Sequence, residues 1–441
     1  MNRRRIGKST KPQGYPEQLL HAIGKHLPHA GLPLHSQDVR VRWTDRMLAT
    51  GGILLSWSNG STLLDAFESA RRTLVSMYPS RRRPGRTAKG FFKALAQRSP
   101  ELLATLQGHL RRRVVQVAGS RWRWKRWVVL AVDGSRVECP RTAANEKAFG
   151  CGGRDKTTPQ QWVTTIFHVV SGLLWDYRTG PATDSERSHL LRMLAGLPLR
   201  ALLLMDAGFT GFALLGSILS SHRHFIVRVG ANVTLLKKLG YDVRDRGSTV
   251  WLWPEGQQGA RPPLTLRKVE FKSHGRKVCL LTSVRSREAL SDAQVKRWYR
   301  QRWMIEVQYR GLKQTMEHRK LLSDSPVMAQ AELGWSLMGL WLLELMQVGS
   351  RRWRRTPRYS LAQTLRVVRR AMQGVGRVPA GGLQRQLRDA LLDRYQRRGR
   401  KKARGWPHKK REKLCGCPNI RTATAREILR AQAFHDQKIP A

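Results

Sequence analysis

Two short apolar runs, each followed directly by an aspartate, constrain the fold of this 441-residue chain more than any other feature. Trp127 to Val132 precedes Asp133, and Ala201 to Met205 precedes Asp206. Apolar runs of about 4–8 residues that end at turn residues are typical of strands buried within a sheet. The chain is therefore expected to contain a sheet in which two buried strands each end in a carboxylate.

The segments around the second run complete the pattern of a mixed sheet. Apolar and polar residues alternate from Trp162 to Val170. After a Ser-Gly turn, Leu173 to Tyr177 is expected to form the second strand of a hairpin. A helix capped by Asp184 or Ser185 follows, and Phe225 to Val229 is a further strand. Strand, hairpin, helix, strand, helix, strand is the order of an RNase H-like fold. We therefore predict an α/β fold with an RNase H-like mixed sheet flanked by helices.

The charge of the chain restricts its partners. Lys and Arg number 82 against 30 Asp and Glu, a formal net charge of +52. So cationic a chain is best neutralised by a polyanion, because bound phosphates release condensed counterions. With 41% hydrophobic residues and 15 Trp, the chain still has enough apolar surface for a core, which argues against disorder throughout. Nucleic acid is the expected partner.

No export signal or membrane span is predicted. Met1 to Lys8 is basic, but polar residues follow where a signal peptide has its apolar region. The most apolar run, Leu333 to Val348, is shorter than the ~20 residues of a span and carries Glu344, so we expect a buried helix. Five Cys with scattered spacing argue against a disulfide framework. We expect a cytoplasmic protein with no membrane partner.

Composition and periodicity divide the chain into regions. They are residues 1–120, mainly helical; 121–230 and 286–350, the α/β core; 231–285, a β-rich insertion; and 351–441, a basic helical or flexible C-terminal region. The helical domain either binds DNA or forms a cap without base contacts, and the sequence leaves both open. The C-terminal region holds 26 Lys and Arg against 5 Asp and Glu, most densely from Arg397 to Arg411, so we expect it to bind phosphate.

A third carboxylate, Glu306, lies in a segment whose polar residues share a helical face. Their spacing alternates between three and four residues, and one helical turn holds 3.6. The residues of this face are Tyr299, Arg302, Glu306, Tyr309 and Lys313. Trp298, Ile305 and Leu312 repeat every seven residues and are expected to be buried opposite it. A plainer interpretation pairs Glu306 with an arginine four residues away on a solvated surface, and an aspartate after a strand often only caps a turn.

Four of these residues form a known signature. The spacing is Tyr, two residues, Arg, three residues, Glu, six residues, Lys, met by Tyr299, Arg302, Glu306 and Lys313. An Asp-x-Gly-Phe pattern begins at Asp206, and the first strand ends in Asp-Gly-Ser from Asp133. Over about residues 125–350 the chain resembles the DDE transposases of bacterial insertion sequences, of the insertion-sequence-four family. The 100 residues between the second and third acids suit the β-rich insertion of that family.

The resemblance implies roles for these side chains. The implied catalytic and metal-binding residues are Asp133, Asp206 and Glu306, and the implied DNA-binding residues are Tyr299, Arg302 and Lys313. Three crowded carboxylates repel one another unless cations lie between them. Two Mg²⁺ ions about 4 Å apart, with Mn²⁺ as a substitute, suit such oxygen ligands and activate both the attacking and the leaving oxygen. Arg and Lys bind phosphate, and an aromatic ring stacks on an unpaired base.

The function implied by the resemblance is that of a DNA transposase. Such an enzyme binds the terminal inverted repeats of an insertion sequence and carries out cut-and-paste transposition by metal-dependent cleavage and strand transfer. The implied partners are double-stranded DNA, as terminal repeat and as target, and a second copy of the chain in the DNA complex, at the bacterial nucleoid. Two alternatives stay open, namely a catalytically inactive, domesticated DNA-binding protein and an RNase H-like nuclease.

Other candidate sites have weaker signals. Gly150 to Gly153 lacks the Gly-Lys-Ser/Thr ending of a phosphate loop, so no nucleotide cofactor is expected. Cys415 and Cys417, even with a nearby His, make an incomplete zinc set. Trp251 or Trp253 in the insertion can stack on a flipped base, although packing within the sheet is the favoured role.

Overall fold

The computed structural model describes the greater part of the chain. The described residues are 14–28, 32, 41–78, 83–152, 157–241, 247–273, 275–349, 360–374, 382–391 and 415–436. The basic stretch from Arg397 to Arg411 therefore lies outside the described residues.

The described strands form one ten-stranded mixed sheet with the order β10-β6-β7-β8-β9-β5-β4-β1-β2-β3. The strands are β1 (Val128–Glu138), β2 (Gln160–His168), β3 (Leu173–Pro181), β4 (Ala201–Met205), β5 (His224–Val229), β6 (Thr234–Lys237), β7 (Thr249–Leu252), β8 (Leu264–Ser273), β9 (Arg276–Thr282) and β10 (Asn419–Thr422). β1, β4 and β5 run parallel, and β2 lies antiparallel between β1 and β3. The two buried strands, the hairpin and the strand that follows them are confirmed.

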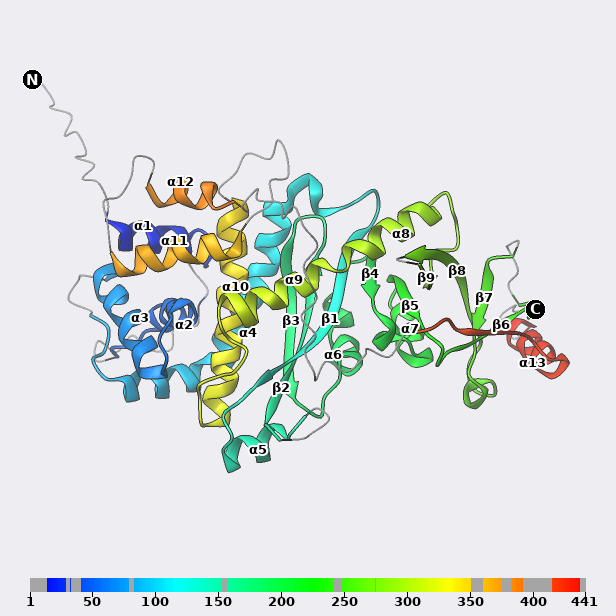
Figure 1. The fold of residues 1–441 in the computed structure, drawn as a ribbon, viewed down its shortest axis with the longest axis horizontal. Coiled ribbons are helices and arrows are strands. Elements are labelled where there is room, and N and C mark those ends of the chain that lie inside the picture. The colour runs from blue at the N-terminus through cyan, green and yellow to red at the C-terminus, as the bar shows by residue number, and fades with distance from the viewer. Residues whose placement is uncertain are drawn as a thin grey trace, which may run out of the picture.

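Helices flank this sheet and form one end of the molecule (Figure 1). They are α1 (Tyr15–Gly24), α2 (Asp45–Trp57), α3 (Leu63–Met77), α4 (Ala88–Ala118), α5 (Ala143–Phe149), α6 (Glu186–Met193), α7 (Phe212–Ser220), α8 (Asp292–Gln301), α9 (Met304–Arg310), α10 (Pro326–Gly349), α11 (Leu361–Gln373), α12 (Gly382–Asp389) and α13 (Ala425–Asp436). α1, α2 and α3 lie at the helical end with α11 and α12, and α4 and α10 connect this end to β3.

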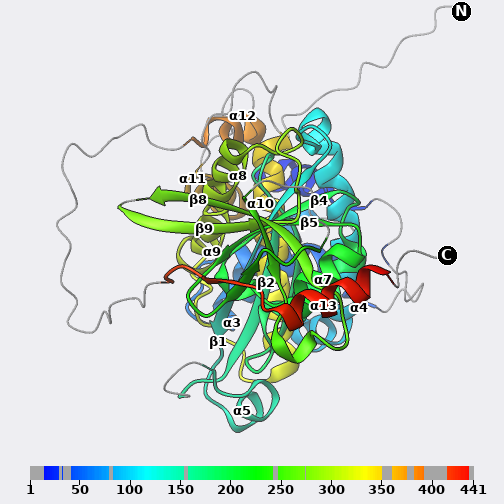
Figure 2. The same ribbon diagram turned by 90° about the vertical axis from the view of Figure 1, so that its right-hand side faces the viewer.

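The segment predicted as a β-rich insertion, residues 231–285, contains β6 to β9. These strands form no separate sheet, because β9 pairs antiparallel with β5 and continues the central sheet. β10 comes from the C-terminal region and pairs in parallel with β6 at the outer edge. Figure 2 shows this end of the molecule, where α13 lies beside the strands.

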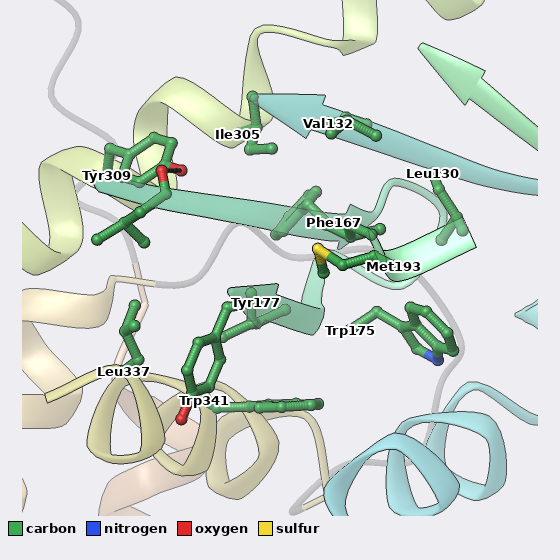
Figure 3. Close-up of a cluster of buried hydrophobic side chains, with 14 of the residues drawn as sticks. Leu130, Val132, Phe167, Trp175, Tyr177, Met193, Ile305, Tyr309, Leu337 and Trp341 are labelled. Carbon is green, nitrogen blue, oxygen red and sulfur yellow. Dashed lines mark hydrogen bonds between the residues drawn. The ribbon is translucent and has the colours of Figure 1, made fainter. Parts of the chain in front are cut away.

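The apolar run predicted as a buried helix is the centre of α10. Every side chain from Ala331 to Leu343 is buried, and α10 packs on α2, α4 and β3. Figure 3 shows Trp341 of α10 against Tyr177 of β3, with their ring centroids 6.5 Å apart. In the part of the chain that the structure describes, no helix has the length and apolarity needed to cross a membrane. α10 therefore joins the helical end to the sheet.

Glu344 links α10 to the elements around it. Its carboxylate accepts hydrogen bonds from the Leu174 backbone N–H on β3 at 2.7 Å and from Nε2 of Gln308 on α9 at 3.3 Å. The loss of surrounding water raises the pKa of Glu344 to about 8, and these two hydrogen bonds oppose the shift. The native state thus keeps a proton on this side chain at pH values where the unfolded chain has released it.

We expect the stability of the protein to fall as the pH rises from about 4.5 towards 8, because the unfolded chain binds fewer protons at Glu344 than the native state over this range. Glu344→Gln should reduce this fall and should raise the free energy of unfolding by roughly 1–3 kcal/mol above pH 8. Urea unfolding at pH 5.5 and 8.5 measures both. Glu101→Gln, at an exposed glutamate of α4, controls for a general charge effect. Identical pH dependence in wild type and Glu344→Gln would contradict the assignment.

Candidate active site

Asp133 on β1 and Asp206 directly after β4 lie at equivalent positions relative to the parallel pairing of these two strands. The last paired residues of β1 and β4 are Ala131 and Leu204, and each aspartate lies two residues further along. The prediction that the first strand ends at Asp133 is wrong, because β1 continues to Glu138 through its antiparallel pairing with β2. Asp133 therefore lies inside a strand, at the level where β4 stops.

Each aspartate also accepts a hydrogen bond from the backbone that follows it. The N–H of Gly134 donates to Oδ1 of Asp133 at 3.0 Å, and the N–H of Gly208 donates to Oδ1 of Asp206 at 2.8 Å. Asp206 caps the 3-10 turn Ala207–Phe209 in this way. One oxygen of each carboxylate is thus held by the backbone, and this fixes the direction in which the other points.

The third predicted acid, Glu306 on α9, is linked to Asp133 by one guanidinium group. Nη2 of Arg302 lies 2.8 Å from Oε1 of Glu306, and Nη1 lies 3.8 Å from Oδ2 of Asp133. The charge of Arg302 also acts on Asp206, as it does on the other two acids. The structure therefore brings all three predicted acids together around Arg302, and the expected pairing of Glu306 with an arginine four residues away exists at the same time.

The prediction of one continuous helix across the signature is wrong. α8 ends at Gln301 and α9 begins at Met304, and between them the backbone forms i→i+3 hydrogen bonds, as from the N–H of Glu306 to the carbonyl of Trp303. The chain then widens into a π-helical turn, Gly311–Thr315, where a Cβ on Gly311 would lie 2.5 Å from Leu361. Close packing on α11 thus accompanies the change of pitch, and such π turns are frequent at functional sites.

Tyr309, predicted on the polar face, is instead buried beneath it. Its hydroxyl lies 2.9 Å from the carbonyl of Asp133 and 3.1 Å from the carbonyl of Val163 and donates towards both. In Figure 3 its ring lies over the core beside Ile305. Ile305 is buried, as predicted, together with Trp298 and Leu312. Tyr309 therefore ties α9 to β1 and β2 directly beneath Asp133.

The remaining signature residues lie beside the acids. Nζ of Lys313 donates to the hydroxyl of Ser135 on β1 at 2.7 Å. The guanidinium carbon of Arg302 is 6.0 Å from the ring centroid of Tyr299. Burial raises the pKa of the Tyr299 hydroxyl, while the positive charge of Arg302 opposes the shift. Lys313 and Tyr299 thus place a cation and an aromatic ring close to the carboxylates.

A fourth carboxylate, Glu186, is present that the sequence analysis did not identify. Burial and the negative charges of Asp206 and Asp133 raise the pKa of Glu186 to about 7. Burial likewise raises the pKa of Asp133 to about 6, with the charges of Asp206 and Glu306 adding to the effect and Arg302 opposing it. Glu186 is the first residue of α6, where an acid is so ordinary that the sequence carries no signal of a site.

The chemistry of these donors fits a divalent cation. The side chains offer only carboxylate oxygens, which Mg²⁺ and Mn²⁺ prefer. Within the described ranges, no three side chains of His, Cys, Asp or Glu are placed to hold a metal ion as they stand. Arg302 explains this for two of the acids, because its guanidinium bridges Asp133 and Glu306 and supplies the positive charge itself.

The weaker candidates lie away from this site. Trp251 and Trp253 are buried, and their indole N–H groups donate to the backbone carbonyls of Tyr241 at 3.0 Å and Arg261 at 2.7 Å. The favoured packing role is therefore confirmed for both. Cys415 lies beside Gly230, where the N–H of the next residue donates to its carbonyl at 2.9 Å.

The segment that contains this site is similar to known proteins. Residues 124–342 match the family model of the transposase DDE domain. The chain is 28% identical over 229 residues to the transposase InsG for insertion sequence element IS4 of Escherichia coli (strain K12), which covers 49% of this chain and 51% of that protein. The chain thus matches about half the length of this curated relative. A structure of the piggyBac transposase synaptic complex with hairpin DNA aligns with a TM-score of 0.42 and 12% identity, over 86% of this chain and 82% of that chain.

We expect Tyr309→Phe to lower the free energy of unfolding by about 1–3 kcal/mol, because it leaves the buried carbonyls of Asp133 and Val163 without their shared donor. Tyr78→Phe is a matched control, since within the described part of the chain the Tyr78 hydroxyl has one polar contact, 3.4 Å from the Thr50 hydroxyl. Urea unfolding of the three proteins gives the comparison. Equal losses in both variants would show that the Tyr309 hydroxyl does not anchor α9 on the sheet.

Proposed function

We propose that the chain is a DNA transposase of the DDE type, which cuts the ends of an insertion sequence and joins them to a target. The match of residues 124–342 to the transposase DDE domain and the likeness to the transposase of IS4 support this proposal. The observation that carries the proposal is the convergence of Asp133, Asp206 and Glu306 around Arg302, from segments far apart in the sequence. In reaction terms, the protein is a polynucleotidyl transferase acting by phosphodiester hydrolysis and transesterification.

The fold in this proposal is RNase H-like. Five neighbouring strands support it, in the order β3-β2-β1-β4-β5, with β2 alone running antiparallel to the rest. Asp133 lies on β1, the central strand of these five, and Asp206 lies directly after the neighbouring strand β4. Such an arrangement holds the two aspartates on rigid strands, near the carboxyl end of β4, where open α/β sheets commonly bind ligands.

The proposed cofactor is Mg²⁺, as two ions, with Mn²⁺ able to substitute. Asp133, Asp206 and Glu306 would hold them, and bound ions of this kind activate an attacking oxygen and stabilise a leaving one. The chain's own part begins with Arg302, whose guanidinium leaves Glu306 and Asp133 and turns to a DNA phosphate. Lys313 binds a second phosphate from its position beside Ser135.

The DNA contacts in this proposal extend beyond the carboxylates. Tyr299 stacks on a base displaced from the terminal repeat, which its aromatic ring beside Arg302 favours. Residues 1–120, with α1 to α4, bind the terminal inverted repeat, and residues 351–441 add phosphate contacts through their positive charge. The active complex is a homodimer that holds two DNA ends, and it acts at the nucleoid in the bacterial cytoplasm.

We expect the full chain to cleave a labelled terminal inverted repeat in Mg²⁺, and Asp206→Asn and Glu306→Gln to lose at least about 100-fold in rate, because each removes a charge that the reaction centre needs. Both variants should still bind the DNA in a mobility-shift assay. Glu146→Gln, at an exposed glutamate paired with Arg141, is the matched control for loss of one charge. Equal cleavage by all four proteins rejects the role of these acids in the reaction. No cleavage by wild type on its own ends rejects the proposal and favours a DNA-binding protein without activity.

We also expect Ala replacements of Lys and Arg within Arg397 to Arg411 to weaken binding to every DNA sequence by a similar factor. Each lost phosphate contact should reduce the slope of log K against log salt by about 1. Binding isotherms on cognate and scrambled duplexes at several salt concentrations measure this. A change in sequence preference would show instead that this segment reads bases.

A further inference from the structure

The carboxylate of Glu186 lies against the glycines that follow the two aspartates of the site, and the negative charges of both aspartates act on it. A Cβ on Gly134, the residue after Asp133, would come 2.8 Å from Oε2 of Glu186. A Cβ on Gly208, two residues after Asp206, would overlap Oε1 of the same carboxylate. Glycine at these two positions therefore leaves the room that the Glu186 side chain occupies.

Helix capping does not account for this placement. Ser185 is the N-cap of α6, and it exchanges hydrogen bonds at 3.2 Å with Ser188, so the capping box is complete without the carboxylate. Arg187 holds the start of the helix against the second acid, because its Nε donates to the carbonyl of Gly208. Among the described residues the Glu186 carboxylate itself has no hydrogen bond or ion pair.

The charged form of an acid beside two others, without a donor of its own, is costly unless a cation compensates it. Arg302 bridges Asp133 and Glu306 and forms no ion pair with Glu186 among the described residues, although its charge lowers the pKa of Glu186. Oε1 of Glu306 is engaged by Arg302 at 2.8 Å. Neither oxygen of the Glu186 carboxylate has such a partner among the described residues, so both can accept a cation.

We infer that Glu186 is a fourth ligand for a divalent cation, on the side of the site formed by Asp133 and Asp206. This inference rests on the proposed function, because it assigns a further residue to the same metal site. The unpaired carboxylate and the two glycines that admit it carry the inference. The ligand is a hard divalent ion such as Mg²⁺ or Mn²⁺, which carboxylate oxygens suit.

Binding of Mn²⁺ to the full-length, metal-free protein tests this without relying on activity. Electron paramagnetic resonance of free Mn²⁺ during titration gives the affinity. We expect Glu186→Gln to weaken Mn²⁺ binding by about 10–100-fold, and Asp206→Asn to weaken it at least as much. Glu146→Gln, which removes one exposed acid from α5, should bind Mn²⁺ as wild type does.

Gly208→Ala also tests whether the Glu186 carboxylate binds the ion, and it provides the test if Glu186→Gln does not fold. Its Cβ displaces the Glu186 carboxylate, so it should weaken Mn²⁺ binding in wild type and have little further effect in the Glu186→Gln background. Wild-type affinity in both single variants, with loss in Asp206→Asn, overturns the role of Glu186 and leaves the proposed function intact. Wild-type affinity in Asp206→Asn as well would reject the metal site of the proposed function itself.

Discussion

The parallel pairing of β1 with β4 determines where the rest of the site can lie. β4 stops after Met205, while β1 continues to Glu138 because β2 remains beside it. Beyond Met205, β1 is therefore paired with β2 on one side and, within the described residues, has no strand on the other side. Asp133 and Asp206 lie at the point where β4 ends. Tyr309 anchors α9, which carries Glu306, at this point. Its hydroxyl donates to the backbone carbonyls of Asp133 on β1 and Val163 on β2.

Charge balance explains how acids persist together in a chain of net charge +52. Arg302 compensates Asp133 and Glu306, while burial and mutual repulsion favour the protonated forms of Asp133 and Glu186. The negative charge of the site is thus reduced in two ways, by an internal cation and by the raised pKa values of two of its acids.

The sequence predicted what depends on local pattern and missed what depends on packing. Uninterrupted apolar runs identified the buried strands, and fixed spacing identified the signature acid Glu306. Periodicity alone does not report register, so the extension of β1 past Asp133 was missed. The break between α8 and α9 was missed as well, because the change of pitch goes with contacts to other elements, as at Gly311 on α11. Glu186 was missed because its partners are set by tertiary structure, not by spacing.

The last strand of the sheet comes from the far end of the chain. β10 forms the outer edge by pairing in parallel with β6, and Glu427 of α13 holds Arg421 of β10 at 2.7 Å. Glu427 also accepts a hydrogen bond from Nε2 of Gln258 at 2.9 Å, so side chains as well as strand pairing fasten the C-terminal segment to the outer strands. A chain shortened before residue 415 would lose all of these contacts, and β6 would become the strand at the edge of the sheet.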